Sequence, residues 1–278
     1  MNINYFQLGL GILFAILISL TAWKARSLSI SGAVAATLLG TVVFGLGGLV
    51  WAILLMVFFI TSSGLSHVFK KKKLALDEKF SKGSQRDAGQ VLANGGIAGF
   101  FVILHLFYPH QIFPWLGFAG ALAAANADTW ATELGVLSSA GAVLITSGKP
   151  VEKGTSGGVS FFGTLAAFCG AGLLALAAAF LSTMAVALPF PWEKVFFIIM
   201  GISLAGLLGS LVDSLLGATI QAIYRCPVCD KETEKHPLHS CGTPTTLVRG
   251  LGWLDNDWVN IGCTLVGGLL GLLIFIWF

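Results

Sequence analysis

Three acidic residues of this 278-residue chain, Asp128, Glu133 and Asp213, lie inside long apolar stretches. A charged side chain at the middle of a membrane-spanning helix costs about 2.5–3.5 kcal/mol, so it needs a partner, a proton or a bound cation, and such acids commonly mark function. Mg²⁺ is commonly held by one or two carboxylates together with substrate phosphates. We therefore predict that Asp128 and Asp213 bind Mg²⁺. For Glu133 two roles stay open, a metal ligand and a partner that holds helices together.

Four further polar residues are expected at the same depth of the membrane. Asp255 and Asp257 immediately precede the last apolar stretch, where they would be further Mg²⁺ ligands or neighbours of the ligands. Asn94 and Asn126 would orient a phosphate or a metal-bound water. The predicted catalytic residues are Asp128, Asp213, Asn94, Asn126, Glu133 and Asp257.

Basic residues and a glycine-rich loop provide candidate phosphate-binding groups. Lys82 and Arg86 precede one apolar stretch, and Lys149 and Lys153 flank the loop GTSGGVS at 154–160. A glycine-rich loop that enters a helix offers backbone N–H groups and the positive end of the helix dipole to an anion. The loop is not a Walker A sequence, and loops of this composition without any ligand are the alternative. Its candidate phosphate-binding residues are Thr155, Ser156, Gly157, Gly158 and Ser160.

Cysteines gather in one segment of the C-terminal part of the chain. Cys226 and Cys229 form a C-x2-C pair that is followed by His236, His239 and Cys241. This spacing suits a closed tetrahedral zinc site, which has no open position for a water nucleophile. We predict a structural Zn²⁺ held by Cys226, Cys229, His239 and Cys241. A redox pair and unliganded thiols are the alternatives.

The composition places these residues in a membrane protein. Only 10% of the residues are Asp, Glu, Lys or Arg, 56% are hydrophobic, and the mean hydropathy is +0.86, whereas about 25% charge is typical of soluble domains. A membrane-spanning helix needs about 20 mostly apolar residues. Eight stretches meet this need, although the second is short and could be re-entrant. They are residues 5–23, 30–45, 48–66, 91–108, 114–137, 159–183, 195–224 and 258–277.

The basic residues give the expected orientation of these spans. Lys and Arg favour cytoplasmic loops, and of the 16 Lys and Arg residues only Lys194 falls on the other side of the membrane. We therefore predict an all-α, polytopic helix bundle with both termini outside, formed by one transmembrane domain over residues 1–278. The Cys/His knuckle lies in a cytoplasmic loop at 225–257, between the last two spans. The site is expected on the cytoplasmic face of the inner or plasma membrane, and nothing favours nucleic acid as a partner.

Helical spacing assigns the polar residues of the fifth span to two faces. Asp128 shares one face with Ala131 and Gly135, and Asn126 shares the opposite face with Glu133. A helix that is polar on two sides is either buried in a bundle or locally broken. The sequence leaves both possibilities open.

The seventh span combines its acid with small residues along one stripe. Small residues let helices pack closely in lipid, and they would equally let a bulky phosphate or nucleotide approach the carboxylate. Both interpretations stay open for this stripe. It consists of Gly206, Ser210, Asp213, Gly217 and Gln221.

Five motifs in order resemble the integral membrane family of plant phytyl-phosphate kinase. They are QVLANG at 90–95, NADTWATELG at 126–135, GTSGGVS at 154–160, GSLVDSLLGA at 209–218 and DNDWVN at 255–260. The pattern Asp128-x2-Ala131-x3-Gly135 is also similar to one in CTP-dependent dolichol and phytol kinases and in CDP-diacylglycerol synthases. The cysteine segment is not part of the plant pattern.

The resemblance implies transfer of a phosphoryl group from a nucleoside triphosphate, CTP or another, to an isoprenyl monophosphate of the phytyl or geranylgeranyl type. An isoprenyl phosphate keeps its tail among membrane lipids while its headgroup meets a soluble nucleotide, so a Mg²⁺ site at the inner membrane surface suits this chemistry. One alternative is a prenol or polyprenol kinase or a CTP-dependent lipid cytidylyltransferase. The other is an ion-coupled secondary transporter, because such carriers hold polar groups near broken helices. The prenyl chain, the nucleotide and the oligomeric state stay open.

Overall fold

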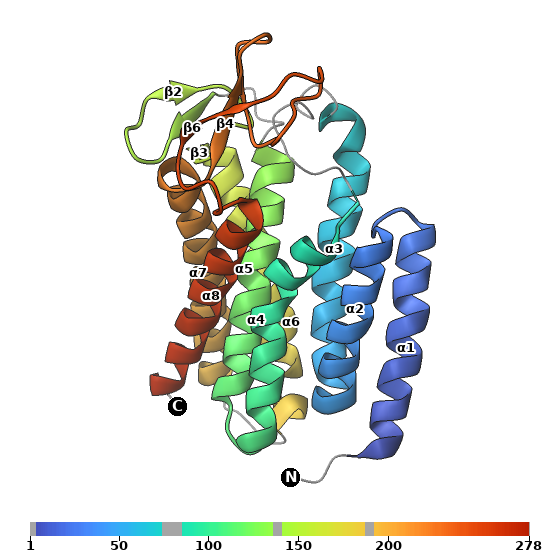
Figure 1. Cartoon of the computed structure of the whole chain (residues 1–278). Helices are drawn as coiled ribbons and strands as arrows, with labels where there is room; N and C mark the ends of the chain where they lie inside the picture. The colour runs from blue at the N-terminus through green and yellow to red at the C-terminus, as the bar shows by residue number, and fades with distance from the viewer. Residues whose placement is uncertain (1–3, 74–84, 136–140, 187–191, 278) are drawn as a thin grey trace.

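The computed structural model describes residues 4–73, 85–135, 141–186 and 192–277, which form a helix bundle with short strands at one end (Figure 1). We call this end of the bundle the strand end. The first helix begins and the last helix ends at the opposite end (Figure 1). The long helices are α1 (Tyr5–Lys24), α2 (Ile30–Val42), α3 (Leu49–Lys73), α4 (Ala88–Phe107), α5 (Phe113–Gly135), α6 (Phe161–Val186), α7 (Trp192–Thr219) and α8 (Asn256–Leu273).

These eight helices coincide with the eight predicted spans. Among the described residues, seven of them are long and apolar enough to cross a membrane. The exception is α5, which has 23 residues but also carries the polar motif around Asp128. The second span, predicted to be short or re-entrant, runs through α2 into a π-helical turn, η1 (Val43–Gly47). Its 18 residues are long and apolar enough to cross a membrane.

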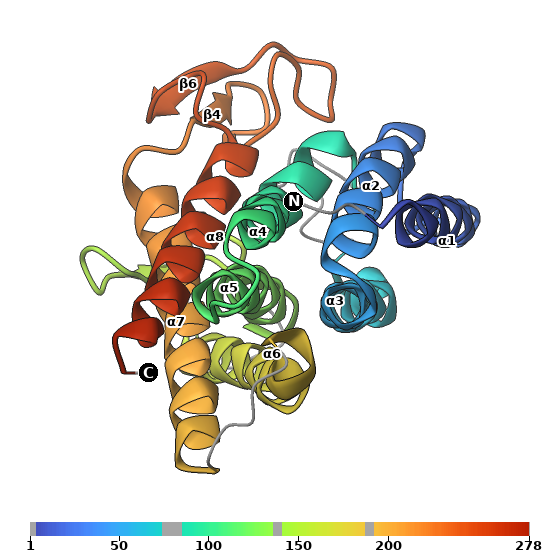
Figure 2. The ribbon, with the colours of Figure 1, turned by 90° about the horizontal axis from the view of Figure 1, so that it is seen from below.

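Helix α5 occupies the centre of the bundle. Helices α4, α6, α7 and α8 surround it, while α1 and α2 lie at the edge beside α3 (Figure 2). Every residue of α5 from Pro114 to Ala127 is buried. This position resolves the question posed by the two polar faces of α5, because a helix enclosed on all sides can present polar groups to several neighbours.

Glycines allow α5, α7 and α8 to approach one another closely. A Cβ atom on Gly267 of α8 would lie 2.5 Å from Ala124 Cβ and 2.6 Å from the Gly120 carbonyl oxygen, both in α5. A Cβ atom on Gly209 of α7 would lie 2.6 Å from Ala124 Cβ and 2.8 Å from the Cys263 carbonyl oxygen. Close packing of this kind stabilises helix pairs in lipid, where burial of apolar surface cannot do so.

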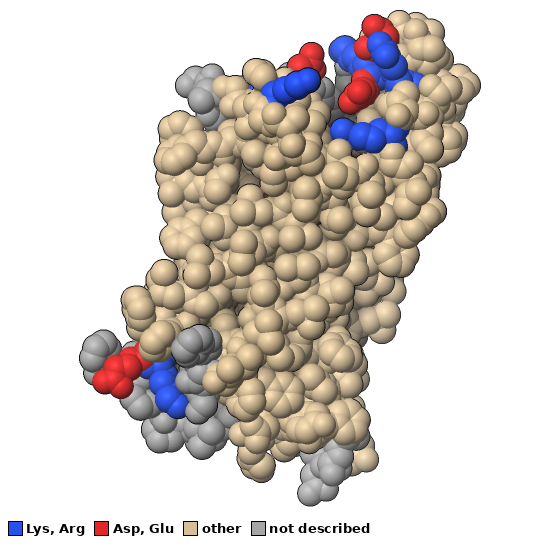
Figure 3. Space-filling view, turned by 90° about the vertical axis from the view of Figure 1, so that its left-hand side faces the viewer, with Lys and Arg blue, Asp and Glu red and all other residues tan. Residues whose placement is uncertain are grey.

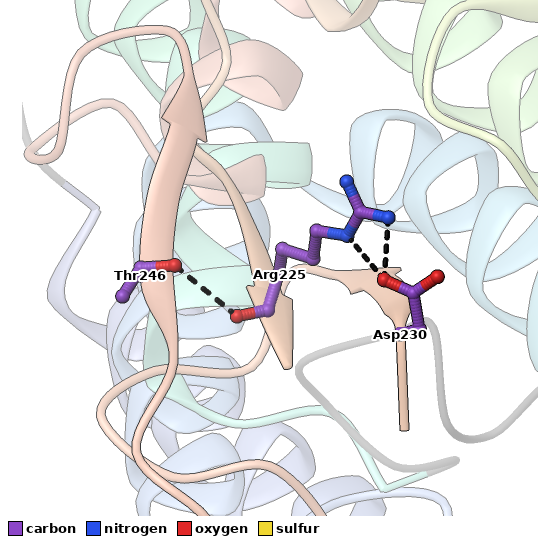
Figure 4. Close-up of polar contacts among 3 residues, drawn as sticks. All are labelled: Arg225, Asp230 and Thr246. Atoms are coloured by element: carbon purple, nitrogen blue, oxygen red, sulfur yellow. Dashed lines mark hydrogen bonds and ion pairs between the residues drawn. The ribbon is translucent and has the colours of Figure 1, made fainter. Parts of the chain in front are cut away.

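Two small antiparallel sheets cover the strand end, a feature that the sequence did not predict. One has the order β2-β1-β3, and the other has the order β5-β4-β6. In the second sheet Thr246 Oγ1 donates to the Arg225 carbonyl, and Arg225 pairs with Asp230 at the surface (Figure 4). The strands are β1 (Ala142–Leu144), β2 (Pro150–Val151), β3 (Gly158–Val159), β4 (Ile223–Cys226), β5 (Lys231–Thr233) and β6 (Thr246–Arg249).

Charged side chains gather at the two ends of the molecule. On the face drawn in Figure 3, blue and red atoms lie at the top and bottom, and a band without charged atoms separates them. Exposed apolar side chains such as Ile16, Leu38 and Phe180 lie on the helices of the bundle. An apolar belt between two charged ends is the surface that a protein needs within a bilayer.

The close contact of α8 with α5 predicts a clear effect of one methyl group. Gly267→Ala should lower the thermal unfolding midpoint in detergent, because the added Cβ overlaps Ala124 and overpacking typically costs about 1–3 kcal/mol. Gly96→Ala in α4 is the matched control, since a Cβ there meets nothing within 4 Å. An equal or higher midpoint for Gly267→Ala than for Gly96→Ala would contradict the packing described here.

Candidate functional site

Asp128 and Asp213 come together just above the glycine contact of α5, α7 and α8. Asp128 follows Ala124 by four residues and Asp213 follows Gly209 by four, so each acid lies one helical turn, about 6 Å, closer to the strand end than this contact. The Asp128 charge acts on the Asp213 carboxyl. The charges of both acids act on the Cys263 thiol of α8. The predicted proximity of the two acids is therefore present in the structure.

A third acid, Glu234, joins this pair from the second sheet. Its charge also acts on Asp213, and its Oε1 atom accepts a hydrogen bond of 2.9 Å from Gln221 Nε2. Sequence reasoning missed Glu234, because it lies between Cys229 and His239 in a segment whose spacing pointed only to zinc. We call Asp128, Asp213 and Glu234 the acid cluster.

The glycine-rich loop packs on the end of α7 beside the acid cluster. Ser156 Oγ donates to Gln221 Oε1, and Arg249 donates to the Gly217 carbonyl at 3.2 Å. A Cβ atom on Gly157 would lie 2.4 Å from Ala218 Cβ, so this glycine is needed for the close contact. Gly157 also has a positive φ of 83°, which favours glycine. Gly217 and Gln221 of the predicted stripe therefore serve packing and hydrogen bonding to the loop.

Several groups of the glycine-rich loop are hydrogen-bonded within the protein. The Thr155 N–H donates to the Glu152 carbonyl and the Gly158 N–H donates to the Thr155 carbonyl, within a tight turn. Ser160 Oγ accepts from the Gly163 N–H and so caps the start of α6. Phosphate binding by Thr155, Gly158 and Ser160 stays a prediction.

The opposite polar face of α5 connects this helix to its neighbours. Asn126 is fully buried; its Nδ2 donates to the Gly170 carbonyl of α6 at 2.8 Å and its Oδ1 accepts from Thr61 of α3. Glu133 Oε1 accepts a hydrogen bond of 2.7 Å from Ser66 of α3. Of the two roles open for Glu133, the structure supports that of a helix partner. Asn126 likewise holds helices together, and its role in orienting a ligand stays a prediction.

Arg86 lies on this second side of α5, where α4 begins. Its guanidinium lies over the Phe58 ring, 5.6 Å from the ring centroid, and interacts with the charge of Glu133. Burial lowers the pKa of Arg86 to about 10 against the opposing effect of Glu133, so the side chain stays cationic at neutral pH. The backbone of Arg86 is tied to the loop before α2 by hydrogen bonds with Ser27 and Ser29.

The other predicted phosphate-binding and metal-binding residues have varied positions. Lys149 is exposed in the connection between β1 and β2, and Lys153 is half-buried after β2, whereas Lys82 lies outside the described residues. Asn94 Nδ2 donates to the Gln90 carbonyl within α4.

The two acids before α8 differ in their surroundings. Asp255 is exposed and caps α8, accepting from the N–H groups of Asp257 and Trp258. Its role as a further Mg²⁺ ligand or a neighbour of the ligands stays a prediction. Asp257 is half-buried in the first turn of α8, six residues or about 9 Å of helix above the level of Cys263.

The cysteine cluster assembles as the spacing predicted. One ligand atom from each of Cys226, Cys229, His239 and Cys241 lies within 4.8 Å of the others. The Cys226 and Cys241 sulfurs are 3.6 Å apart, and His239 Nδ1 is 3.2 Å from Cys241 Sγ. His236 lies outside the cluster and stacks on Tyr224. His239 is thus the histidine that the structure groups with the three thiols.

Comparison with known proteins identifies a family and several relatives. The family described as "Integral membrane protein DUF92" matches residues 13–268. Protein PGR of Arabidopsis thaliana is 37% identical over 95% of this chain and 95% of its own length. An uncharacterized membrane protein of Methanocaldococcus jannaschii is 32% identical over 97% of this chain and 94% of its own length.

The chain also matches part of a longer protein. Protein VTE6, chloroplastic, of Arabidopsis thaliana is 26% identical over 88% of this chain and 65% of its own length. No solved structure matches the chain. Together these matches confirm the resemblance to a plant and prokaryotic family of integral membrane proteins that the five motifs indicated.

The position of Asn126 predicts that its amide stabilises the bundle. Asn126→Ala should lower the free energy of unfolding by about 1–2 kcal/mol, because it removes the hydrogen bonds to α3 and α6. Asn94→Ala is the matched control, since the Asn94 side chain donates to the Gln90 carbonyl within its own helix. Thermal unfolding in detergent measures both. Unchanged stability of Asn126→Ala would contradict a structural role for this amide.

Proposed function

The chain belongs to the DUF92 family of integral membrane proteins, and from this premise we propose that it is an isoprenyl-phosphate kinase. In this proposal a nucleoside triphosphate, CTP or another, donates its γ-phosphoryl group to an isoprenyl monophosphate in the membrane. An oxygen of the acceptor phosphate forms a bond to the γ-phosphorus, and the bond from the γ-phosphorus to the β–γ bridging oxygen breaks. The products are the isoprenyl diphosphate and the nucleoside diphosphate.

The observation that carries the proposal is the acid cluster. The charges of Asp128 and Glu234 both act on the Asp213 carboxyl, and Asp213 Oδ2 is buried without a hydrogen-bond partner among the described residues. Such a concentration of negative charge at membrane depth requires a compensating cation or proton. Carboxylate oxygens are the ligands that Mg²⁺ takes in proteins, so Asp128 and Asp213 fit the cofactor expected of a kinase. Bound Mg²⁺ would neutralise phosphate charge during transfer.

The remaining residues bind and position the two substrates. The Arg86 guanidinium carries five N–H donors that suit a phosphate, and it would hold the acceptor headgroup. Lys149 and Lys153 lie on or beside the first sheet at the strand end, where a soluble nucleotide can reach them. The acceptor phosphate is already ionised, so its attack needs alignment and charge neutralisation and no strong general base.

The depth of the acid cluster favours an enzyme over a carrier. Asp128 is seven residues, about 10 Å, from the strand end of α5 and fifteen residues, about 23 Å, from the other end. Carriers place their substrate and ion sites near the bilayer midplane. A lipid kinase needs its metal near one surface, where a soluble nucleotide meets the headgroup. We place the strand end in the cytoplasm, on the segregation of Lys and Arg to that side.

A panel assay tests the kinase directly. Purified protein in detergent is incubated with Mg²⁺, each of four nucleoside triphosphates and prenyl monophosphates of several chain lengths, and products are identified by mass spectrometry. We expect a prenyl diphosphate with at least one donor. Release of inorganic pyrophosphate with a cytidylylated lipid would indicate a cytidylyltransferase, and phosphorylation of free prenols alone would indicate a prenol kinase. No product from any combination contradicts the kinase.

Isosteric variants test the assigned metal ligands. Asp128→Asn and Asp213→Asn should each lower kcat at least about a hundredfold while the protein stays folded, since loss of metal charge removes several kcal/mol of transition-state stabilisation. Asp230→Asn is the matched control, because Asp230 pairs with Arg225 at the surface (Figure 4). Near-normal turnover of either variant would remove that residue from the metal site.

We also propose that the cysteine cluster binds a structural Zn²⁺. A tetrahedral site with the usual Zn–S length of about 2.3 Å separates its sulfurs by about 3.8 Å, which fits the 3.6 Å between Cys226 and Cys241. Glu234 lies in the segment between Cys229 and His239. A zinc ion there would restrain the chain on both sides of this acid.

Elemental analysis tests the zinc proposal. The purified chain should contain about one zinc per molecule, and Cys226→Ser should lose it together with thermal stability. Cys169→Ser is the matched control, since Cys169 lies in α6 outside the cluster. Zinc-free protein with the thermal stability of a zinc-supplemented sample would overturn this proposal.

A further inference from the structure

A groove lies on the side of the bundle away from the acid cluster, between α1, α2, α3 and α4. The empty space along it, counted together with the part that opens to the surroundings, is about 790 Å³. Helix α1 packs on α2 and η1 and lies at the edge of the molecule, away from the bundle around α5 (Figure 2). The groove therefore faces the lipid phase of the membrane.

The lining of the groove is apolar over most of its length and polar mainly at one end. Among the lining residues that the structure describes, only Ser19, Arg86, Gln90 and Asn94 are polar. Three of these lie at or near the start of α4, at the strand end. The remaining lining is apolar and includes Phe14 of α1 and Phe44 of η1, whose ring centroids are 5.8 Å apart.

The length of the groove suits a chain rather than a compact ligand. Its lining extends from Leu28, just before α2, to Phe44 of η1, and the thirteen residues of α2 between them correspond to about 20 Å of helix. Small residues such as Ala36, Gly40 and Ala52 contribute to the walls. The groove thus offers a long apolar surface that ends at a cationic guanidinium.

We propose that this groove holds the isoprenyl chain of an isoprenyl monophosphate, with the phosphate at Arg86. This inference rests on the proposed function, because it identifies where the acceptor of that reaction binds. Arg86 lies where the apolar groove approaches α5. Its guanidinium lies over the Phe58 ring in the groove wall and interacts with the charge of Glu133 in α5. An apolar tail with an anionic headgroup complements both the apolar length and the charged end.

Photo-crosslinking locates the bound chain independently of turnover. A geranylgeranyl monophosphate analogue with a diazirine on its tail is irradiated with the purified full-length protein in lipid nanodiscs, and labelled peptides are mapped by mass spectrometry. Labels should fall on α1 and α3 residues of the groove, such as Phe14 and Met56, and unlabelled geranylgeranyl monophosphate should displace them. Labels outside the groove, or equal displacement by phosphatidylglycerol, would overturn the proposal.

Two substitutions on one helix separate the groove from general damage to the fold. Ala36→Phe fills the groove and should reduce crosslinking of the analogue at least about tenfold. Val34→Phe is the matched control, since Val34 is 58% exposed and does not line the groove; it should crosslink like the natural chain. Equal crosslinking of Ala36→Phe and Val34→Phe contradicts the proposal.

The headgroup contact is tested by a comparison of two ligands. Arg86→Ala should weaken binding of geranylgeranyl monophosphate about tenfold to a hundredfold, because a hydrogen bond to a charged group is worth about 1.5–3 kcal/mol, and should leave binding of the uncharged geranylgeraniol unchanged. Equal weakening of both ligands would remove the phosphate from Arg86. Specific labelling of the groove without any kinase turnover would support the lipid site and reject the kinase, so the two proposals fail separately.

Discussion

The burial of polar groups on α5 is the constraint on which the rest of the structure depends. This helix carries Asn126, Asp128 and Glu133 within about two turns and lies inside the bundle, where a polar group without a partner costs several kcal/mol. Each of the three interacts with a neighbouring helix: Asn126 bonds to α3 and α6, Glu133 bonds to α3, and the charge of Asp128 acts on Asp213 of α7. The arrangement of the surrounding helices follows from these contacts and from the glycines that allow them.

The two polar faces of α5 lie beside different groups, acids on one side and an arginine beside an apolar groove on the other. Asp128 and Glu133 are five residues apart and therefore point about 140° apart around the helix axis. The acid cluster lies on one side, with the glycine-rich loop and the second sheet. Arg86 and the apolar groove lie on the other. If the nucleotide binds with the acid cluster and the lipid binds in the groove, the two substrates meet over the strand end of α5.

Much of the fold could be predicted from the sequence, because the length of an apolar stretch and the spacing of polar residues act locally. All eight helices lie where apolar stretches predicted them, and the two polar faces of α5 do contact different neighbours. The zinc-type cluster also assembles from residues whose spacing alone pointed to it. What could not be predicted depends on contacts between distant segments. Glu234 reaches Asp213 through the fold of the second sheet, and Gly157 meets Ala218 across sixty residues of sequence.

The central claim is that Asp128 and Asp213 form a cation site at one end of the bundle. Electron paramagnetic resonance of Mn²⁺, used in place of Mg²⁺, tests this claim on the purified protein without any assumption about the substrate. We expect a signal from bound Mn²⁺ that added Mg²⁺ displaces. Asp128→Asn and Asp213→Asn should each remove this signal, and Asp230→Asn should retain it. The same Mn²⁺ binding in the natural chain and in both variants would contradict this claim.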